Sequence, residues 1–239
     1  MAARFSRQMK ASALLCAALF PLTFLYDEIL LRLFAGEGLF PFLQYPFLTA
    51  LAAGLLAAVL TSFGKKSLQR VLKTAVLLLA SLWFIIQTLL NRVYAMYFPF
   101  SSIGGEAGDV ASEYTDMLFR TILLGIPIIV LYLLPPALYI LSLLRRKRRT
   151  VPDTVSLSGH AKKREIAVLL GLFVILQSAS VLSESHGSQA DLYGMGYTFD
   201  NATRVFGLLT STRLDLRYLL FGMDESGSFD LDTDRKSVV

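Results

Sequence analysis

Residues 166–182 read IAVLLGLFVILQSASVL, an apolar run that contains no charged side chain. The hydrocarbon core of a bilayer offers peptide groups no hydrogen-bond partner, so a run of this kind must close its backbone bonds internally, as a helix. About 20 apolar residues are enough to cross roughly 30 Å of hydrocarbon. The stretch therefore predicts a membrane-spanning helix.

Four further apolar runs lie upstream of this stretch, at Ala11 to Ala35, Phe47 to Phe63, Val71 to Tyr94 and Leu118 to Leu144. The fourth is interrupted by prolines, which kink helices but are tolerated when neighbouring helices pack against them. The chain as a whole is 54% hydrophobic and 17% charged, with a mean hydropathy of +0.56. We predict an all-α integral membrane protein with about five transmembrane helices.

The first run follows a short basic head, as the apolar part of a signal peptide would. It is too long for that role, and no small-residue cleavage site followed by a soluble domain comes after it. We interpret it as a helix that is retained in the membrane.

Lysine and arginine set the orientation, because they are retained on the cytoplasmic side. With the N-terminus inside, the inside segments carry most of the 23 basic residues and, of the 18 acidic ones, only Asp153 and Glu165. The inside basic residues are Arg4, Arg7, Lys10, Lys65, Lys66, Arg70, Lys73, Arg145, Arg146, Lys147, Arg148, Arg149, Lys162, Lys163 and Arg164. This distribution explains the net charge of +5 without a nucleic-acid partner. The cluster at 145–149 is a topology signal or, alternatively, a contact for anionic lipid headgroups.

Two parts of the chain follow from this topology. Residues 1–183 form the five-helix transmembrane domain, and 184–233 form an extracellular linker. Within the linker, Phe206 to Phe221 has apolar residues at helical spacing, with Arg213 and Arg217 on one face. This pattern predicts an amphipathic helix on the outer membrane surface or, alternatively, a helix that packs against a following domain.

Asp27, Glu28 and Arg32 interrupt the outer half of the first apolar run. Charges within a span are costly and frequently functional. Glu28 and Arg32 are four residues apart, so they share a helix face and can pair. The alternative is an interfacial ion pair whose side chains extend toward the outer headgroups.

No catalytic or metal-binding constellation is visible in the sequence. The two histidines, His160 and His186, fall on opposite sides of the membrane in this topology and cannot share a metal. The single cysteine, Cys16, lies inside the first apolar run and cannot form an internal disulfide.

Three stretches together resemble the membrane part of the lipoteichoic acid synthase family, the sulfatase-like phosphoglycerol transferases of Gram-positive bacteria. They are FPLTFLYDE at 20–28, FPFSSIGGEAGDV at 98–110, and VFGLLTSTRLDL at 205–216, which runs on to LFG at 220–222. The five-helix, N-inside arrangement is similar as well, and the resemblance covers nearly the whole chain.

The resemblance implies a multi-pass protein of the bacterial plasma membrane whose C-terminal tail is extracellular. Its helices would anchor a following domain of the alkaline phosphatase superfamily. That domain would use a threonine nucleophile and a divalent metal, typically manganese, to move glycerol phosphate from phosphatidylglycerol onto a growing polymer. The sequence stops before such a domain, so no catalytic residue, metal ligand or cofactor is expected in this chain. The last six residues, 234–239 (DRKSVV), look like one reading frame of a sequencing-library adapter and are expected not to be biological.

The expected partners are membrane lipid, the missing sulfatase-like domain and the cell-envelope or division machinery. Two rival functions remain open: a transporter or channel, and an envelope assembly or sensor protein. The candidate residues for lipid-headgroup or interdomain contacts are Glu28, Arg32, Arg92, Asp109, Arg213 and Asp215.

Overall fold

A computed structural model describes residues 2–36, 44–100, 115–148, 159–186, 190–193 and 197–221. Every regular element in these ranges is helical, which confirms the all-α prediction for this part of the chain. The elements are α1 (Ala2–Ala35), α2 (Gln44–Leu60), α3 (Lys66–Tyr94), α5 (Thr115–Leu124), α6 (Ile126–Arg148), α7 (Gly159–His186), the short 3-10 helix η2 (Ala190–Tyr193), α8 (Phe199–Phe206) and α9 (Leu208–Phe221).

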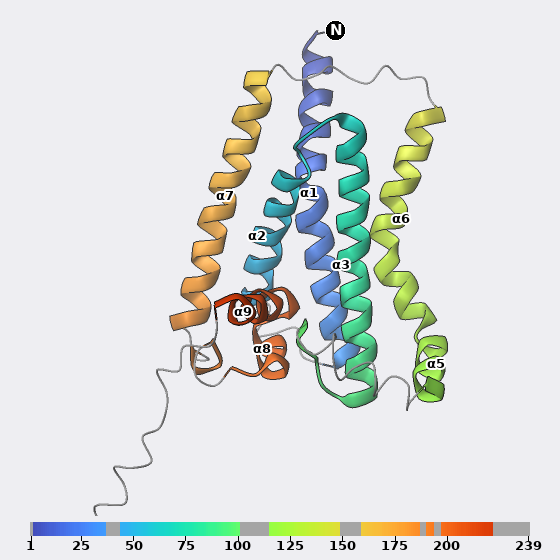
Figure 1. The fold of residues 1–239 in the computed structure, drawn as a ribbon. Helices are drawn as coiled ribbons and strands as arrows, with labels where there is room; N and C mark the ends of the chain where they lie inside the picture. The colour runs from blue at the N-terminus through green and yellow to red at the C-terminus, as the bar shows by residue number, and fades with distance from the viewer. Residues whose placement is uncertain are drawn as a thin grey trace, which may run out of the picture.

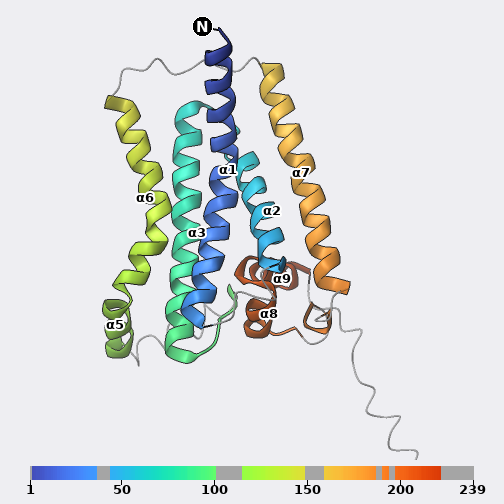
Figure 2. The same ribbon diagram turned by 180° about the vertical axis from the view of Figure 1, so that it is seen from behind.

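The five long helices pack as a row in the order α7, α2, α1, α3, α6 (Figure 1). Helices that follow one another along the chain run in opposite directions, so the neighbours α1 and α3 run the same way, and the view from behind gives the same order reversed (Figure 2). The C-terminal ends of α1, α3 and α7 therefore lie at the same end of the bundle as α5, α8 and α9. We call this end the tail end, and we call α8 and α9 together (residues 199–221) the tail.

Three helices are long and apolar enough to cross a membrane, over Lys66–Tyr94, Ile126–Arg145 and Lys163–His186. The apolar helix α2 is shorter, with 17 residues. The structure thus agrees with the membrane class. The total of five spans and their orientation stay predictions.

Helices α1 and α2 approach each other closely at Pro21 and Gly54. A Cβ atom built on Gly54 would lie 2.3 Å from the backbone nitrogen of Pro21. The alanines of α2 that face the core, Ala50 and Ala58 among them, are also buried. Small residues let two helix backbones approach in this way, which places α2 firmly against the centre of the row.

The fourth apolar run differs from the prediction, because it forms two helices rather than a single interrupted span. The break falls at Gly125, where a Cβ atom would lie 2.6 Å from Cδ2 of Leu89. Pro127 is the second residue of α6, where its missing N–H costs no helical bond. Pro135 and Pro136 lie inside the continuous helix α6.

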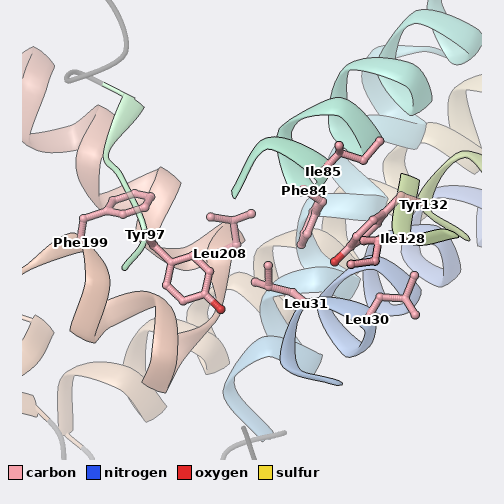
Figure 3. Close-up of a cluster of buried hydrophobic side chains, with 9 residues drawn as sticks. All are labelled: Leu30, Leu31, Phe84, Ile85, Tyr97, Ile128, Tyr132, Phe199 and Leu208. Carbon is pink, nitrogen blue, oxygen red and sulfur yellow. The ribbon is translucent and has the colours of Figure 1, made fainter. Parts of the chain in front are cut away.

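The tail shares a hydrophobic core with the bundle (Figure 3). The ring of Phe84 in α3 stacks on that of Tyr132 in α6 at 6.1 Å between centroids, and the Tyr132 hydroxyl lies 2.9 Å from the Thr88 hydroxyl. The buried members of this core are Leu30, Leu31, Phe84, Ile85, Tyr97, Ile128, Tyr132, Phe199 and Leu208. Because Phe199 and Leu208 belong to it, the tail packs as part of the bundle.

Candidate functional site: the polar contact between bundle and tail

Glu184, in the last turns of α7, is completely buried and lies at the centre of a polar cluster. Its Oε1 lies 3.0 Å from the Thr49 hydroxyl of α2, 2.8 Å from the Ser180 hydroxyl and 2.9 Å from the Thr210 hydroxyl of α9. Its Oε2 accepts a 2.5 Å hydrogen bond from Nη2 of Arg213, also on α9. A single carboxylate therefore joins α2, α7 and α9.

Three hydroxyl groups and a guanidinium surround the Glu184 carboxylate, and all of them can donate hydrogen bonds to it. A buried ion pair of this kind adds little net stability compared with an apolar pair of the same shape. Removing one partner, however, leaves an uncompensated buried charge and costs about 3–5 kcal/mol. The contact consequently fixes where α9 lies more than it adds to overall stability.

Glu28 of α1 caps the N-terminus of α9. Its two carboxylate oxygens accept hydrogen bonds from the backbone N–H groups of Leu208, at 3.3 Å, and Leu209, at 2.9 Å. The first N–H groups of a helix have no partner inside the helix, and the positive end of the helix dipole also lies there. The Glu28 carboxylate accepts hydrogen bonds from these N–H groups and places a negative charge at the positive end of the dipole. It does so from a position 180 residues before Leu208 in the sequence.

Gly207 makes this cap possible. Its φ of +91° lies in the region that favours glycine, and a Cβ atom there would lie 2.9 Å from Oε2 of Glu28 and 3.0 Å from Cγ of Pro46. Gly207 also separates α8 from α9, which is why the predicted helix 206–221 begins at Leu208.

Arg32, one turn after Glu28, is 2% exposed and donates from Nη2 to the carbonyl oxygen of Val205 at 3.1 Å. That carbonyl belongs to the last turn of α8, where the negative end of the helix dipole favours a cation. Glu28 and Arg32 share a face of α1, as the sequence predicts. They hold the α8–α9 junction from both sides, with the carboxylate on the N–H groups of α9 and the guanidinium on the carbonyl of α8.

Asp27, beside Glu28, is fully buried, and no group among the described residues donates a hydrogen bond to either of its carboxylate oxygens. Burying a carboxyl group without a hydrogen-bond partner is unfavourable. This position therefore differs from Glu28 and Glu184, whose carboxylate oxygens all have hydrogen-bond donors.

The segment that follows α3 is fastened to the start of the tail. The N–H of Tyr97 donates to Oδ1 of Asp200 at 2.8 Å, and Arg204 binds the same carboxylate through Nε at 3.0 Å. Arg204 also donates to the carbonyl oxygen of Ala95 at 2.6 Å, and its guanidinium lies 5.5 Å from the centre of the Tyr97 ring. Arg204 of α8 thus contacts the segment after α3 at two positions, Ala95 and Tyr97.

A few residues further along, the same segment is held by α3 and α9. Gln87 exchanges two hydrogen bonds with the backbone of Phe98, at 2.7 and 3.1 Å. The N–H of Phe100 then donates to Oδ2 of Asp215 at 2.7 Å. These bonds satisfy backbone groups in a stretch without regular structure, which orders it against the tail.

Tyr197, just before α8, donates its hydroxyl proton to the carbonyl oxygen of Ser211 at 3.3 Å. Burial raises the pKa of Tyr197, and the neighbouring Asp215 and Tyr218 raise the pKa further. The hydroxyl therefore stays neutral and keeps its proton for this bond.

The structure brings together four of the six candidate contact residues. Glu28, Arg32, Arg213 and Asp215 all lie where the tail meets the bundle or the segment after α3. Arg92 is exposed in the last turn of α3. Asp109 lies outside the described residues.

Sequence reasoning missed Glu184 and its hydroxyl partners, as well as Asp200. A weak signal was available, because Ser180 and Glu184 are four residues apart at the end of an apolar run and so share a helix face. Thr49 and Thr210 carry no comparable signal. Their role depends on the fold, which places them beside a carboxylate more than 100 residues away in one case and 26 in the other.

Chemically, the arrangement holds helices in place. Most of its carboxylate oxygens are occupied by donors from the chain itself, and the described residues contain no group of three or more His, Cys, Asp or Glu side chains that could hold a metal. No protein-family model matches the chain, and comparisons with curated proteins and with solved structures found no match.

Proposed function

We propose that this chain is the membrane part of a sulfatase-like phosphoglycerol transferase of the lipoteichoic acid synthase type. In this proposal it resides in the bacterial plasma membrane and holds an outside domain at the bilayer surface. The observation that carries the anchoring role is the attachment of the tail by Glu28, Arg32 and Glu184. The assignment to the transferase family comes from the sequence resemblance.

The attachment supports an anchoring role because it fixes the direction in which the chain leaves the bundle. A tail joined only by apolar contacts could slide, whereas charged hydrogen bonds have narrow distances and angles. A domain that follows α9 would then stand at a defined height and orientation above the membrane.

We further propose five spans, with the N-terminus inside and the tail outside. The alternating directions of the five long helices are consistent with this topology (Figure 1), and so is the segregation of basic residues. The short α2 and the charged end of α1 would be shielded from lipid by their neighbours in the row. Phosphatidylglycerol would be the lipid donor, and manganese would bind in the following domain.

Under this proposal the buried residues Glu28 and Arg32 serve the contact with the tail rather than a lipid headgroup. Arg92, which is exposed at the tail end, is better suited to lipid. Contacts with the envelope or division machinery would fall on the following domain.

Two experiments test the proposal. The orientation is tested in a Cys16→Ser background with single cysteines at Asn201 and Lys65. A membrane-impermeant maleimide added to intact cells should label the cysteine at 201 and leave the cysteine at 65 unlabelled. The reverse result would refute the topology.

The enzymatic assignment is tested with the complete gene product. The genomic sequence beyond Thr233 should encode a domain with a sulfatase-type nucleophile and metal ligands. Reconstituted in vesicles with headgroup-labelled phosphatidylglycerol and Mn²⁺, that product should form a glycerol phosphate polymer. A natural stop codon near Thr233 would overturn the assignment.

One observation favours a second candidate, a transporter. Asp27 is a fully buried carboxyl in α1 without a hydrogen-bond donor among the described residues, and intramembrane carboxyls commonly bind transported protons or ions. Ion flux into vesicles that Asp27→Asn abolishes would favour this function over anchoring.

A further inference from the structure

Two short helices at the tail end, α5 and α9, both expose large apolar side chains. They lie on opposite sides of α3, as both views show (Figures 1 and 2). In α5, Phe119 and Leu124 are 63% and 64% exposed. In α9, Leu219 and Leu220 are 59% and 72% exposed.

The exposed apolar side of α9 is not a by-product of its packing. The side that faces the bundle carries the buried polar residues Thr210, Ser211 and Asp215, which bond to α7, to the carbonyl oxygen of Gly207 and to the segment after α3. The bundle-facing side thus combines polar side chains with the buried Leu208 and Leu214, whereas the outward side carries Leu219 and Leu220. A surface helix of a domain in water would instead carry mainly polar and charged residues on its outward side.

The surroundings of the two helices identify what covers them. The candidate spans have exposed apolar residues as well, and Leu79 of α3 and Ile175 of α7 are each 66% exposed. Each helix also carries an exposed arginine, Arg120 in α5 and Arg217 in α9. A long arginine side chain can reach lipid phosphate while the neighbouring leucines lie among the acyl chains.

We propose that α5 and α9 are two interfacial anchors that lie in the phospholipid surface at the tail end, on either side of the bundle. Their leucine and phenylalanine side chains enter the outer part of the acyl region, and Arg120 and Arg217 lie at the level of the phosphates. This inference goes beyond the proposed function and requires only that the bundle is inserted in a membrane. It also assigns α5, which the sequence indicates as part of a span, to the interface.

The test uses the full chain with Cys16→Ser and a single bimane-labelled cysteine, reconstituted in phosphatidylglycerol–phosphatidylcholine vesicles. Labels at Leu220 of α9 and Leu123 of α5 should lose fluorescence with lipids brominated near the start of the acyl chains. The same labels should be shielded from iodide in the water. If circular dichroism shows that the first variants are not folded, labels at Leu219 of α9 and Ile122 of α5 replace them.

Two matched positions separate the possible failures. A label at Leu79, in the middle of α3, should be quenched by brominated lipid, and a label at the exposed Asn201 of α8 should be quenched by iodide. If Leu79 is not reached by lipid, membrane insertion itself is refuted. If Leu79 is reached but the labels on α5 or α9 respond to iodide, the anchor proposal alone is overturned. Shielding from both quenchers would mean that protein covers these helices, which also overturns it.

Discussion

The inner helices α1 and α2 differ from the outward faces of the outer helices α6 and α7 in the contacts that they make. The inner pair buries Glu28, Arg32 and Thr49, and its backbones touch at Gly54. The outward faces of the outer pair are rows of exposed leucine, isoleucine and valine. The comparison teaches that directional polar contacts and close backbone approach specify position on inward faces, including that of Glu184 in α7, whereas the outward faces need only to be apolar.

The largest expected effect comes from breaking the buried ion pair of the tail. Arg213→Ala leaves Glu184 uncompensated and should destabilise the fold by about 3–5 kcal/mol. Unfolding of the purified protein by denaturant, followed by circular dichroism, measures this loss. Arg217→Ala, one turn further along the same helix and exposed, is the control and should change stability by less than about 0.5 kcal/mol. Equal effects of the two variants would contradict the role of Glu184.

The next largest effect should come from Glu28, which caps α9. Glu28→Ala removes both acceptors and leaves two helix N–H groups buried, at a cost of about 1.5–3 kcal/mol for hydrogen bonds to a charged group. Glu28→Gln retains one carbonyl oxygen and should recover part of the loss. The same unfolding measurement applies, and a Gln variant no more stable than the Ala variant would argue against the cap.

A pair of glycines sharpens the comparison between an inner and an outer helix. Gly54→Ala places a methyl group against the backbone of Pro21 and should cost about 1–3 kcal/mol. Gly171→Ala in α7 meets nothing within 4 Å and should stabilise its helix by about 0.5–1 kcal/mol. Opposite signs in thermal unfolding are the expected result, and two stabilising substitutions would refute the close contact of α1 and α2.

The smallest effect concerns the only tryptophan of the chain. The indole N–H of Trp83 in α3 donates to the hydroxyl of Thr212 in α9 at 3.0 Å. Thr212→Val should cost about 1 kcal/mol and change the Trp83 emission spectrum in the folded state. Ser142→Ala in α6, which loses a hydroxyl far from the tail, should leave that spectrum unchanged.

The sequence was sufficient to predict the long helices and insufficient to predict the contacts between them. Apolar runs such as 166–182 predict helices because only the solvent and the peptide group enter the argument. The charges at Asp27, Glu28 and Arg32 are visible for the same reason, since they interrupt such a run. Their partners are not visible, because Leu208 and Val205 meet α1 only through the folded chain.

The short helices could not be predicted from the sequence for a different reason. Helix α8 has eight residues, too few for a periodic pattern to separate it from a loop. In α9, the pattern reveals an amphipathic helix but not that Thr210, Ser211 and Asp215 face protein while Leu219 and Leu220 face outward. Amphipathicity reports that two sides differ, and it does not report which solvent each side meets.

The cap on α9 also sets an order of events during synthesis. Glu28 is made 180 residues before the N–H group it binds, so at about 5–20 residues per second it waits on the order of 10–40 s for its partner. Glu184 and Arg32 wait in the same way, although for shorter or similar intervals. The insertion machinery must therefore hold a bundle with unsatisfied charges until α8 and α9 emerge, so the tail end assembles only after the five long helices have been made.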